Sequence, residues 1–310
     1  MKHFLALFLI SLLPFSGCKA KKSNKAAAKM KTFIIEIANY SRSIHPNFII
    51  IPQNGTELLW ANQDTNAGFD LPYTSAISGI GQESVFYEDQ LETDHLNRDL
   101  CHQASAILPV LSSDWGPNNR AECYAFNATY GFIPFPRVDY DYAQIPNEIP
   151  VNVNANNITA LNLAKNYLYL IGASFASKEE MLLKIRATNY DAIIIDLFYE
   201  DLAFTHAEIM SLKTKANGGS RLVIAYMNIG AAEKYRYYYK KGWVRHIPTF
   251  LKRRYKGYKD ETWVKFWDKR WKKIIYGNDE SYTKKIIDAG FDGTYLDNIE
   301  AYYFLYYRDK

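Results

Sequence analysis

The stretch GFDGTYLDNIEA, residues Gly290–Ala301, decides the fold, because it combines a helix end, a short strand and two carboxylates. Gly290 is of the type that commonly ends a helix, and Phe291–Leu296 has the apolar and aromatic composition of a strand. Asp297 and Glu300 lie just past that strand. Enzymes with an α/β barrel carry their chemistry at the C-terminal ends of the strands. An aspartate that only caps the next helix is the alternative.

The composition is that of an ordinary globular protein. The chain has 310 residues, of which 48% are hydrophobic and 23% are charged. This length suits one large domain or two small ones. The formal net charge of +4 is too small to indicate nucleic-acid binding. The composition therefore leaves most classes of folded protein open but disfavours a nucleic-acid partner.

The N-terminus has the pattern of an export signal. A positive start and the apolar stretch Phe4–Leu13 are followed by two small residues and Cys18. A small pair before a cysteine resembles the bacterial lipobox, in which the cysteine is lipidated. The sequence predicts a lipoprotein signal at residues 1–18 with Cys18 lipidated; an ordinary cleaved signal peptide is the alternative. The apolar stretch is too short for a membrane span, and the lysine-rich residues 19–29 are expected to form a flexible tether.

The cysteines and histidines show no pattern of metal-ligand spacing. Export would place Cys101 and Cys123 in an oxidising compartment, so they could pair, although isolated cysteines in apolar helical contexts are more often buried thiols. His45 and His206 have the surroundings of a loop and a helix start. No serine-nucleophile elbow is present. We expect neither a metal nor a cofactor.

From Met30 onward, apolar runs of strand length alternate with helical patterns, and residues 30–310 are predicted to form one domain. Eight near-continuous apolar runs predict an α/β fold, specifically a (β/α)8 barrel. A doubly wound sheet is the rival, but its glycine-rich fingerprint is absent. A helical region is expected over Trp263–Ala289 and a surface loop over Tyr142–Thr159. The eight runs are Phe48–Ile51, Ala76–Gly81, Ala106–Leu111, Gly131–Phe135, Tyr167–Ile171, Ala192–Ile195, Leu222–Tyr226 and Phe291–Leu296.

Seven segments, weak alone but specific as a set, carry a resemblance to a known family. They are Phe48–Leu59, Ala76–Tyr87, Gly131–Val138, Tyr190–Tyr199, Leu222–Tyr238, Trp263–Trp271 and Gly290–Tyr302. Together they resemble the endo-α-1,4-polygalactosaminidases, glycoside hydrolase family 114, and relatives of unassigned function. In that family the equivalent of Tyr167–Tyr302 comes first and that of Met30–Val138 follows. The chain is therefore expected to be a circular permutant, joined through Tyr142–Thr159.

The resemblance implies a catalytic pair. The family's catalytic aspartate falls on Asp297 and its catalytic glutamate on Glu83. By analogy with other barrel glycosidases, Asp297 is expected to be the nucleophile and to stay ionised, and Glu83 to be the acid/base with a raised pKa. Further polar residues at strand ends could line the sugar site, or could only satisfy loops; these are Asp196, Tyr226, Asn228, Gln53, Asn54, Tyr87, Asp114, Tyr295 and Glu300. Tyr235–Tyr238 and Trp243 are candidate stacking surfaces for sugar rings.

These features together predict an exported, lipid-anchored glycoside hydrolase of the cell envelope that cleaves α-linked amino-sugar polysaccharide of the galactosamine type. The protein is expected to be a monomer. The acidic strand ends suit a cationic, deacetylated sugar. The polysaccharide substrate and the membrane, through the lipid, are the expected partners. The alternative is a surface lipoprotein that binds glycans without cleaving them, although a binding module has no need of a carboxylate pair.

Overall fold

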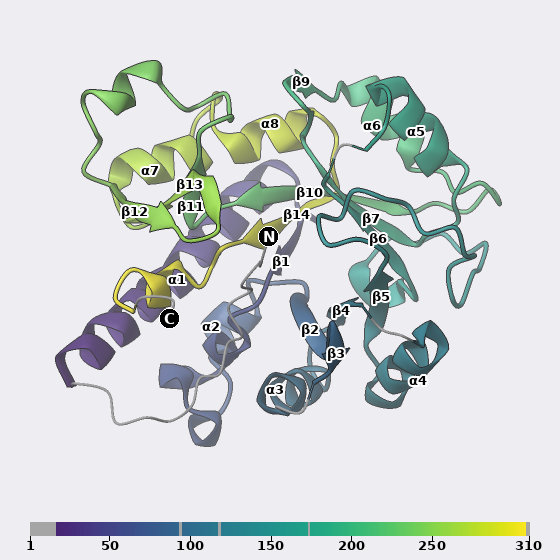
Figure 1. The fold of residues 1–310 in the computed structure, drawn as a ribbon, viewed down its shortest axis with the longest axis horizontal. Coiled ribbons are helices and arrows are strands. Elements are labelled where there is room, and N and C mark those ends of the chain that lie inside the picture. The colour runs from purple at the N-terminus through teal and green to yellow at the C-terminus, as the bar shows by residue number, and fades with distance from the viewer. Residues whose placement is uncertain (1–16, 93–94, 117–118, 173, 308–310) are drawn as a thin grey trace.

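The computed structural model describes residues 17–307 apart from residues 93, 94, 117, 118 and 173. The apolar stretch Phe4–Leu13 of the predicted signal lies outside the described residues. None of the helices in the described part combines the length and the apolar character that crossing a membrane requires. Within it, strands and helices alternate, and most helices lie on the outside of a central set of parallel strands (Figure 1).

The central strands form two parallel sheets. The five-stranded sheet has the order β1-β14-β10-β7-β6, and the four-stranded sheet has the order β3-β2-β4-β5, in which only β3 is antiparallel. The first sheet comprises β1 (Ile49–Pro52), β14 (Gly293–Asp297), β10 (Leu222–Asn228), β7 (Ala192–Asp196) and β6 (Tyr167–Leu170). The second comprises β3 (Gln90–Leu91), β2 (Ile80–Glu88), β4 (Val110–Trp115) and β5 (Ile133–Arg137). The predicted α/β class with mostly parallel strands is confirmed.

The two sheets meet at both of their edges without forming one continuous ladder among the described residues. On one side a single parallel bridge joins Gln53 to Gly81. On the other side β5 lies beside β6, and the rings of Phe135 and Tyr167 are 5.5 Å apart. β5 carries prolines at positions 134 and 136, and a proline has no backbone N–H group to donate. Because alternate residues face the same edge of a strand, both missing N–H groups are on the edge of β5 that faces away from β4.

The first and last strands of the described chain lie side by side. β1 pairs with β14 in parallel, from Ile49 opposite Gly293 to Pro52 opposite Leu296. The expected permuted order of the two halves requires this pairing. Only glycine fits at position 293, because an added Cβ atom would lie 2.4 Å from the carbonyl oxygen of Ile49. Residues from both halves of the sequence therefore share one sheet.

The expected flexible tether is wrong for residues 19–29, because they belong to the long helix α1 (Gly17–Ile44). Four alanines in this stretch favour a helix, and Ala26 and Ala27 are buried together with Met30. Ser23 is also buried and donates a hydrogen bond to the carbonyl oxygen of Tyr302. The small residues between the lysines continue the buried face of the helix. The charge of the lysines made this helical pattern hard to recognise in the sequence.

The expected long helix over Trp263–Ala289 is also wrong. The segment instead contains the end of strand β13 (Tyr258–Val264) and two short helices, α7 (Lys269–Ile275) and α8 (Tyr282–Asp288). Gly277, with φ +94°, separates the helices. β13 pairs with β11 (Ala231–Glu233) and β12 (Leu251–Tyr255) in a small antiparallel sheet.

The remaining elements surround these strands or connect them. The short ladder β8 (Phe198–Tyr199) with β9 (Leu202–Ala203) follows β7. The other α-helices are α2 (Leu71–Thr74), α3 (Leu96–Ala104), α4 (Arg120–Tyr130), α5 (Lys178–Arg186), α6 (His206–Leu212) and α9 (Ala301–Phe304). Single 3₁₀ turns are η1 (Thr56–Leu59), η2 (Ala61–Gln63), η3 (Thr65–Ala67), η4 (Leu161–Leu163) and η5 (Lys241–Val244).

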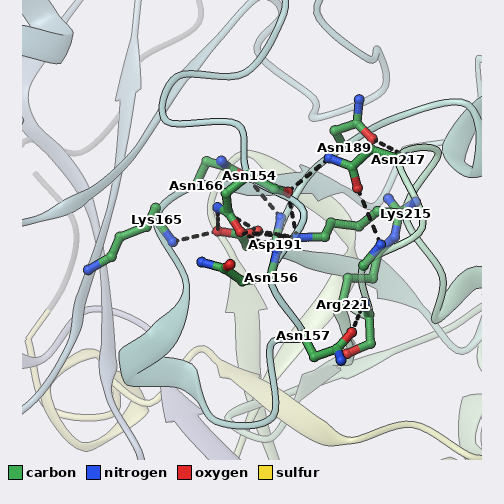
Figure 2. Close-up of polar contacts among 12 residues, drawn as sticks. Asn154, Asn156, Asn157, Lys165, Asn166, Asn189, Asp191, Lys215, Asn217 and Arg221 are labelled. Atoms are coloured by element: carbon green, nitrogen blue, oxygen red, sulfur yellow. Dashed lines mark hydrogen bonds and ion pairs between the residues drawn. The ribbon is translucent and has the colours of Figure 1, made fainter.

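A buried ion pair fixes the irregular segment that leads from β5 to β6. Asp191, just before β7, pairs with Lys215 at 2.9 Å, and both side chains are fully buried. Asn154 of the segment donates to both oxygens of Asp191, and Lys215 donates to the carbonyl oxygen of Asn154 (Figure 2). The predicted loop is thus bound tightly to the end of the sheet that lies opposite Asp297.

Replacing Lys215 by methionine should lower the free energy of unfolding by about 3–5 kcal/mol, because the carboxylate of Asp191 would stay buried without its cation. Lys184→Met is the matched control. Lys184 is 55% exposed and pairs with Glu180 across one helical turn, so its loss should cost less than about 1 kcal/mol. Urea unfolding of both variants measures the difference, and equal effects would contradict the structural role of the pair.

Candidate functional site

Asp297 and Glu83, the two residues of the expected catalytic pair, both lie where a regular parallel ladder ends. Asp297 is the last residue of β14. Glu83 is the last β2 residue in uninterrupted register with β4, and the next residue, Ser84, has φ +53°. β1 lies between the two strands. The charge of Glu83 acts on the carboxyl group of Asp297, so the structure brings these two side chains into one site.

Burial raises the pKa of Asp297 to about 7. The hydroxyl of Tyr226 donates to Oδ2 of Asp297 at 2.5 Å and opposes this rise, the charge of Glu83 adds to it, and the backbone N–H of Asn298 opposes it. Asp297 therefore holds its proton more strongly than an ordinary aspartate, mainly because it is buried. The expectation that Asp297 stays ionised remains a prediction, since burial after the strand end could not be derived from the sequence.

Two hydrogen-bond donors and one cation hold the carboxylate of Glu83. The hydroxyl of Tyr142 donates to Oε1 at 2.6 Å, and Nδ2 of Asn54 donates to Oε2 at 3.2 Å. The guanidinium of Arg137 lies 3.8 Å from Oε1 and also stacks over the ring of Tyr142. Tyr142 and Arg137 were missed in the sequence, although Arg137 ends an apolar run in the same way as Asp297. The expected raised pKa of Glu83 stays a prediction.

Several of the expected lining residues contact the catalytic pair or pack against its neighbours. Tyr226 and Asn54 contact the two carboxylates directly, as described above. Oε1 of Gln53 accepts a hydrogen bond from the hydroxyl of Tyr169 at 3.1 Å. The ring of Tyr295 meets that of Tyr169 edge to face, with centroids 5.1 Å apart. The Tyr295 hydroxyl occupies the space over Gly81, where a Cβ atom would lie only 1.9 Å from it.

Asp196 is at its predicted strand end but is engaged by a cation. Both of its oxygens accept hydrogen bonds from Arg236, at 2.7 and 2.6 Å. Arg236 also binds Glu233, at 2.7 Å. The carboxylate of Asp196 therefore positions Arg236 and does not add a free negative charge to the site.

Asp114 and Tyr87 do not line the site. Asp114 is fully buried and accepts hydrogen bonds from the backbone N–H groups of Phe86 and Tyr87 and from the side chain of Ser112. The Tyr87 hydroxyl donates to Glu122 of α4 at 2.8 Å. The prediction that Asp114 and Tyr87 line the sugar site was wrong because the register of β2 is irregular after Glu83. Both side chains instead contact residues of α4.

Cys101 and Cys123 are both buried, and neither forms a disulfide. Cys123 donates to Oδ2 of Asp114 at 3.5 Å, and Cys101 lies 4.0 Å from the hydroxyl of Thr56. The open question of a disulfide is thus answered in favour of two separate thiols. Among the described residues, no group of three or more histidine, cysteine, aspartate or glutamate side chains is arranged to hold a metal ion.

A third carboxyl group, Glu261 of β13, reaches the site from outside the parallel strands. Oε2 of Glu261 accepts hydrogen bonds from Nδ2 of Asn228 at 3.2 Å and from Nδ2 of Asn298 at 3.5 Å. Burial raises the pKa of Glu261 to about 9, and Glu233 and Asp297 add to the rise. Sequence reasoning missed Glu261, although Gly257 between runs rich in tyrosine and arginine was a signal for a hairpin.

Glu300 lies buried beside the site, and burial raises its pKa well above the ordinary range, with Asp297 adding to the rise. The site as a whole contains more carboxyl groups than cations, and burial raises the pKa values of Asp297, Glu261 and Glu300. The acidic character expected from the strand ends is present, but its members are partly different residues.

Of the candidate stacking residues, Tyr235 lies near the site and donates to Glu233 at 2.6 Å, whereas three others line a cleft beside α7. Tyr237, Tyr238 and Trp243 line a cleft of about 840 Å³ together with Phe250 and residues of α7, including Lys273. The ring of Trp243 meets that of Phe250 edge to face. These aromatic side chains are therefore placed beside α7 and do not stand over Asp297.

Comparison with known proteins supports the resemblance given above. Residues 172–310 match the model of glycoside-hydrolase family GH114. An uncharacterised protein of Methanocaldococcus jannaschii is 31% identical over 180 residues, 55% of this chain and 48% of its own length. An uncharacterised Thermotoga maritima protein is 32% identical over 124 residues, 38% of this chain and 35% of its own. The chain thus spans about half or less of these relatives. The family match includes Asp297 and Glu261, but not Glu83.

Replacing Asp297 by asparagine should stabilise the protein increasingly as the pH rises. The folded pKa of about 7 lies above the ordinary value of 3.8, so the wild-type protein loses stability when this group ionises, whereas asparagine stays neutral. The advantage of the variant should grow by about 2–4 kcal/mol between about pH 4 and pH 8. Thermal unfolding across this range measures it, with Asp288→Asn, an exposed helix residue, as control. A constant difference would contradict the raised pKa.

Proposed function

We propose that this protein is a glycoside hydrolase that cleaves α-linked amino-sugar polysaccharide of the galactosamine type, with Asp297 and Glu83 as its catalytic pair. The observation that carries the proposal is the position of these two carboxyl groups where β14 and β2 end on either side of β1, each accepting a hydrogen bond from a tyrosine hydroxyl. The GH114 match over residues 172–310 supports glycoside hydrolysis as the reaction class. The excess of carboxyl groups supports a cationic sugar.

The reaction needs one carboxylic acid that protonates the leaving oxygen and one carboxylate that attacks or stabilises the oxocarbenium-like carbon. We assign Asp297 as the nucleophile and Glu83 as the acid/base, with retention of configuration. Tyr226 and the backbone N–H of Asn298 hold the carboxylate of Asp297 for attack. Because the pKa of Asp297 is about 7, the attacking fraction should increase as the pH rises through neutrality.

The proposal includes a closed (β/α)8 barrel in permuted order. Its support is the ring of neighbours in which β1 joins β14 to β2 and β5 lies beside β6. In this arrangement the segment between β5 and β6 would be the joint that replaces the original termini. Its many asparagine contacts to the loops before β7 and β10 provide the anchoring that such a joint requires.

Asp297→Asn and Glu83→Gln should each lower kcat/KM on α-1,4-linked galactosamine oligomers by about a thousandfold or more, because each removes one of the two groups that the reaction needs. Mass spectrometry of the products measures turnover, and circular dichroism checks the fold. Glu280→Gln is the control, since this side chain is 86% exposed. Full activity in either variant would contradict the pair, and glycan binding without any turnover of the wild type would favour a binding protein.

The same proteins can separate the two roles. In a Glu83→Ala variant, azide should restore cleavage of an activated α-galactosaminide and yield an azide product of retained configuration, because the intermediate on Asp297 still forms. In an Asp297→Ala variant, azide should instead replace the lost carboxylate in a single displacement and yield an azide product of inverted configuration. A wild-type hydrolysis product of inverted configuration would contradict the retaining assignment.

We further propose that Cys18 is lipidated and holds the protein on the cell envelope. α1 ends just before β1 begins, so the first residues of α1 lie toward the C-terminal ends of the strands. Ser23 of α1 also contacts Tyr302 of α9, the helix that follows β14. A lipid at Cys18 would therefore sit on the side of Asp297. The helix makes this placement rigid where a tether would leave it free.

Cys18→Ser should move the protein from the membrane fraction of a producing bacterium to the soluble fraction, because the thiol that carries the lipid is lost. Mass spectrometry of the purified N-terminal peptide measures the lipid directly. Cys101→Ser is the control for loss of a thiol elsewhere, since this cysteine is buried. Equal partitioning of wild type and Cys18→Ser would contradict the anchor.

A further inference from the structure

Glu261 has a position that the two catalytic roles do not explain. It belongs to a hairpin outside the parallel strands, yet its side chain reaches over the ends of β10 and β14. We propose that Glu261 is the specificity-determining residue that binds the substrate's amino group as a carboxylate. This inference rests on the proposed function, since it concerns the sugar on which Asp297 acts.

The hydrogen bonds of Glu261 leave one oxygen available. Both asparagine donors, Asn228 and Asn298, bind Oε2. In the described part of the chain no donor is within hydrogen-bond distance of Oε1. The side chain is only partly exposed, so water access is restricted without being abolished. One oxygen is thus fixed in place, and the other can accept a hydrogen bond from a ligand.

The neighbours of Glu261 place it beside the reacting carbon. Asn228 is opposite Asp297 in the β10–β14 ladder, and Asn298 follows Asp297 in the chain. A nucleophile at Asp297 attacks the anomeric carbon, and the amino group of a 2-amino sugar is on the adjacent carbon. A carboxylate held by these two asparagines is therefore near the substituent that distinguishes an amino sugar from a neutral one.

The charges around Glu261 favour a cationic ligand. Glu233 of β11 and Asp297 of β14 face it and oppose its ionisation, while Arg236 favours ionisation but is engaged by Asp196 and Glu233. The phenols that surround it stay neutral because burial and these carboxylates raise their pKa values; they are Tyr226, Tyr235, Tyr238 and Tyr255. Without a ligand, Glu261 keeps its proton at neutral pH.

An ammonium group supplies the positive charge that the empty site lacks. It would bind Oε1 through a charge-assisted hydrogen bond and displace the proton of Glu261 into solution. A hydroxyl or an acetamide at the same carbon carries no charge and cannot compensate the neighbouring carboxylates. The site would therefore select the free amine over its acetylated form, and binding would release a proton at slightly acidic pH.

The test is calorimetric binding of methyl α-D-galactosaminide and of its N-acetylated counterpart to the full chain. The wild type should bind the amine at least about tenfold more tightly, and Glu261→Gln should lose this preference while keeping both asparagine contacts. Buffers of different ionisation enthalpy should reveal proton release in the wild type and none in the variant. Asp260→Asn is the control, because Asp260 is adjacent on β13 but is 48% exposed and pairs with Lys234.

The outcomes separate this inference from the proposed hydrolysis. Equal affinity of the wild type for the two sugars, or an unchanged preference in Glu261→Gln, would overturn the role of Glu261 even if the protein cleaves glycans. A preference that depends on Glu261 would support it even in a protein without turnover, since the measurement requires binding alone. A folded variant, checked by circular dichroism, is the condition for either conclusion.

Discussion

The parallel pairing of β1 with β14 is the contact on which the rest of the site depends. It joins a strand near residue 50 to one near residue 295, and the close approach of the two backbones at Gly293 requires a residue without a side chain. β1 then continues to the bridge between Gln53 and Gly81, which brings β2 and Glu83 to the side of Asp297. Asp297 and Glu83 belong to different sheets, and this pairing is what holds the edges of those sheets beside each other.

This pairing also concentrates negative charge, and the structure balances it in two ways. Arg137 forms an ion pair with Glu83, and Arg236 forms ion pairs with Asp196 and Glu233. The carboxyl groups that form no ion pair instead have raised pKa values, since burial raises the pKa of Asp297 to about 7 and that of Glu261 to about 9. A bound cation would lower both pKa values, so these groups can respond to a charged ligand.

The sequence located the strands of the five-stranded sheet well because buried parallel strands are continuous apolar runs, as in Ala192–Asp196 and Leu222–Asn228. It placed two other strands too early, since the runs Ala76–Gly81 and Ala106–Leu111 overlap β2 and β4 only in their last two residues. It could not reveal which way a side chain turns after its strand ends. Asp114 follows the same pattern as Asp297, but it is directed toward backbone N–H groups of Phe86 and Tyr87. That difference depends on the irregular register of β2 against β4 after Glu83, where Ser84 has φ +53°.

The hairpin that carries Glu261 was hidden for a related reason. Its strands β12 and β13 are rich in charged and aromatic residues, because one side covers the site and the other meets solvent, so they lack the apolar run that identified the central strands. Only contact with Asn228 and Asn298 gives Glu261 its significance. Residues that select a substrate are commonly placed on such connecting segments above a rigid scaffold, where local sequence constrains them least. Here the scaffold fixes the position of Asp297, and the hairpin supplies the group that decides which sugar is bound beside it.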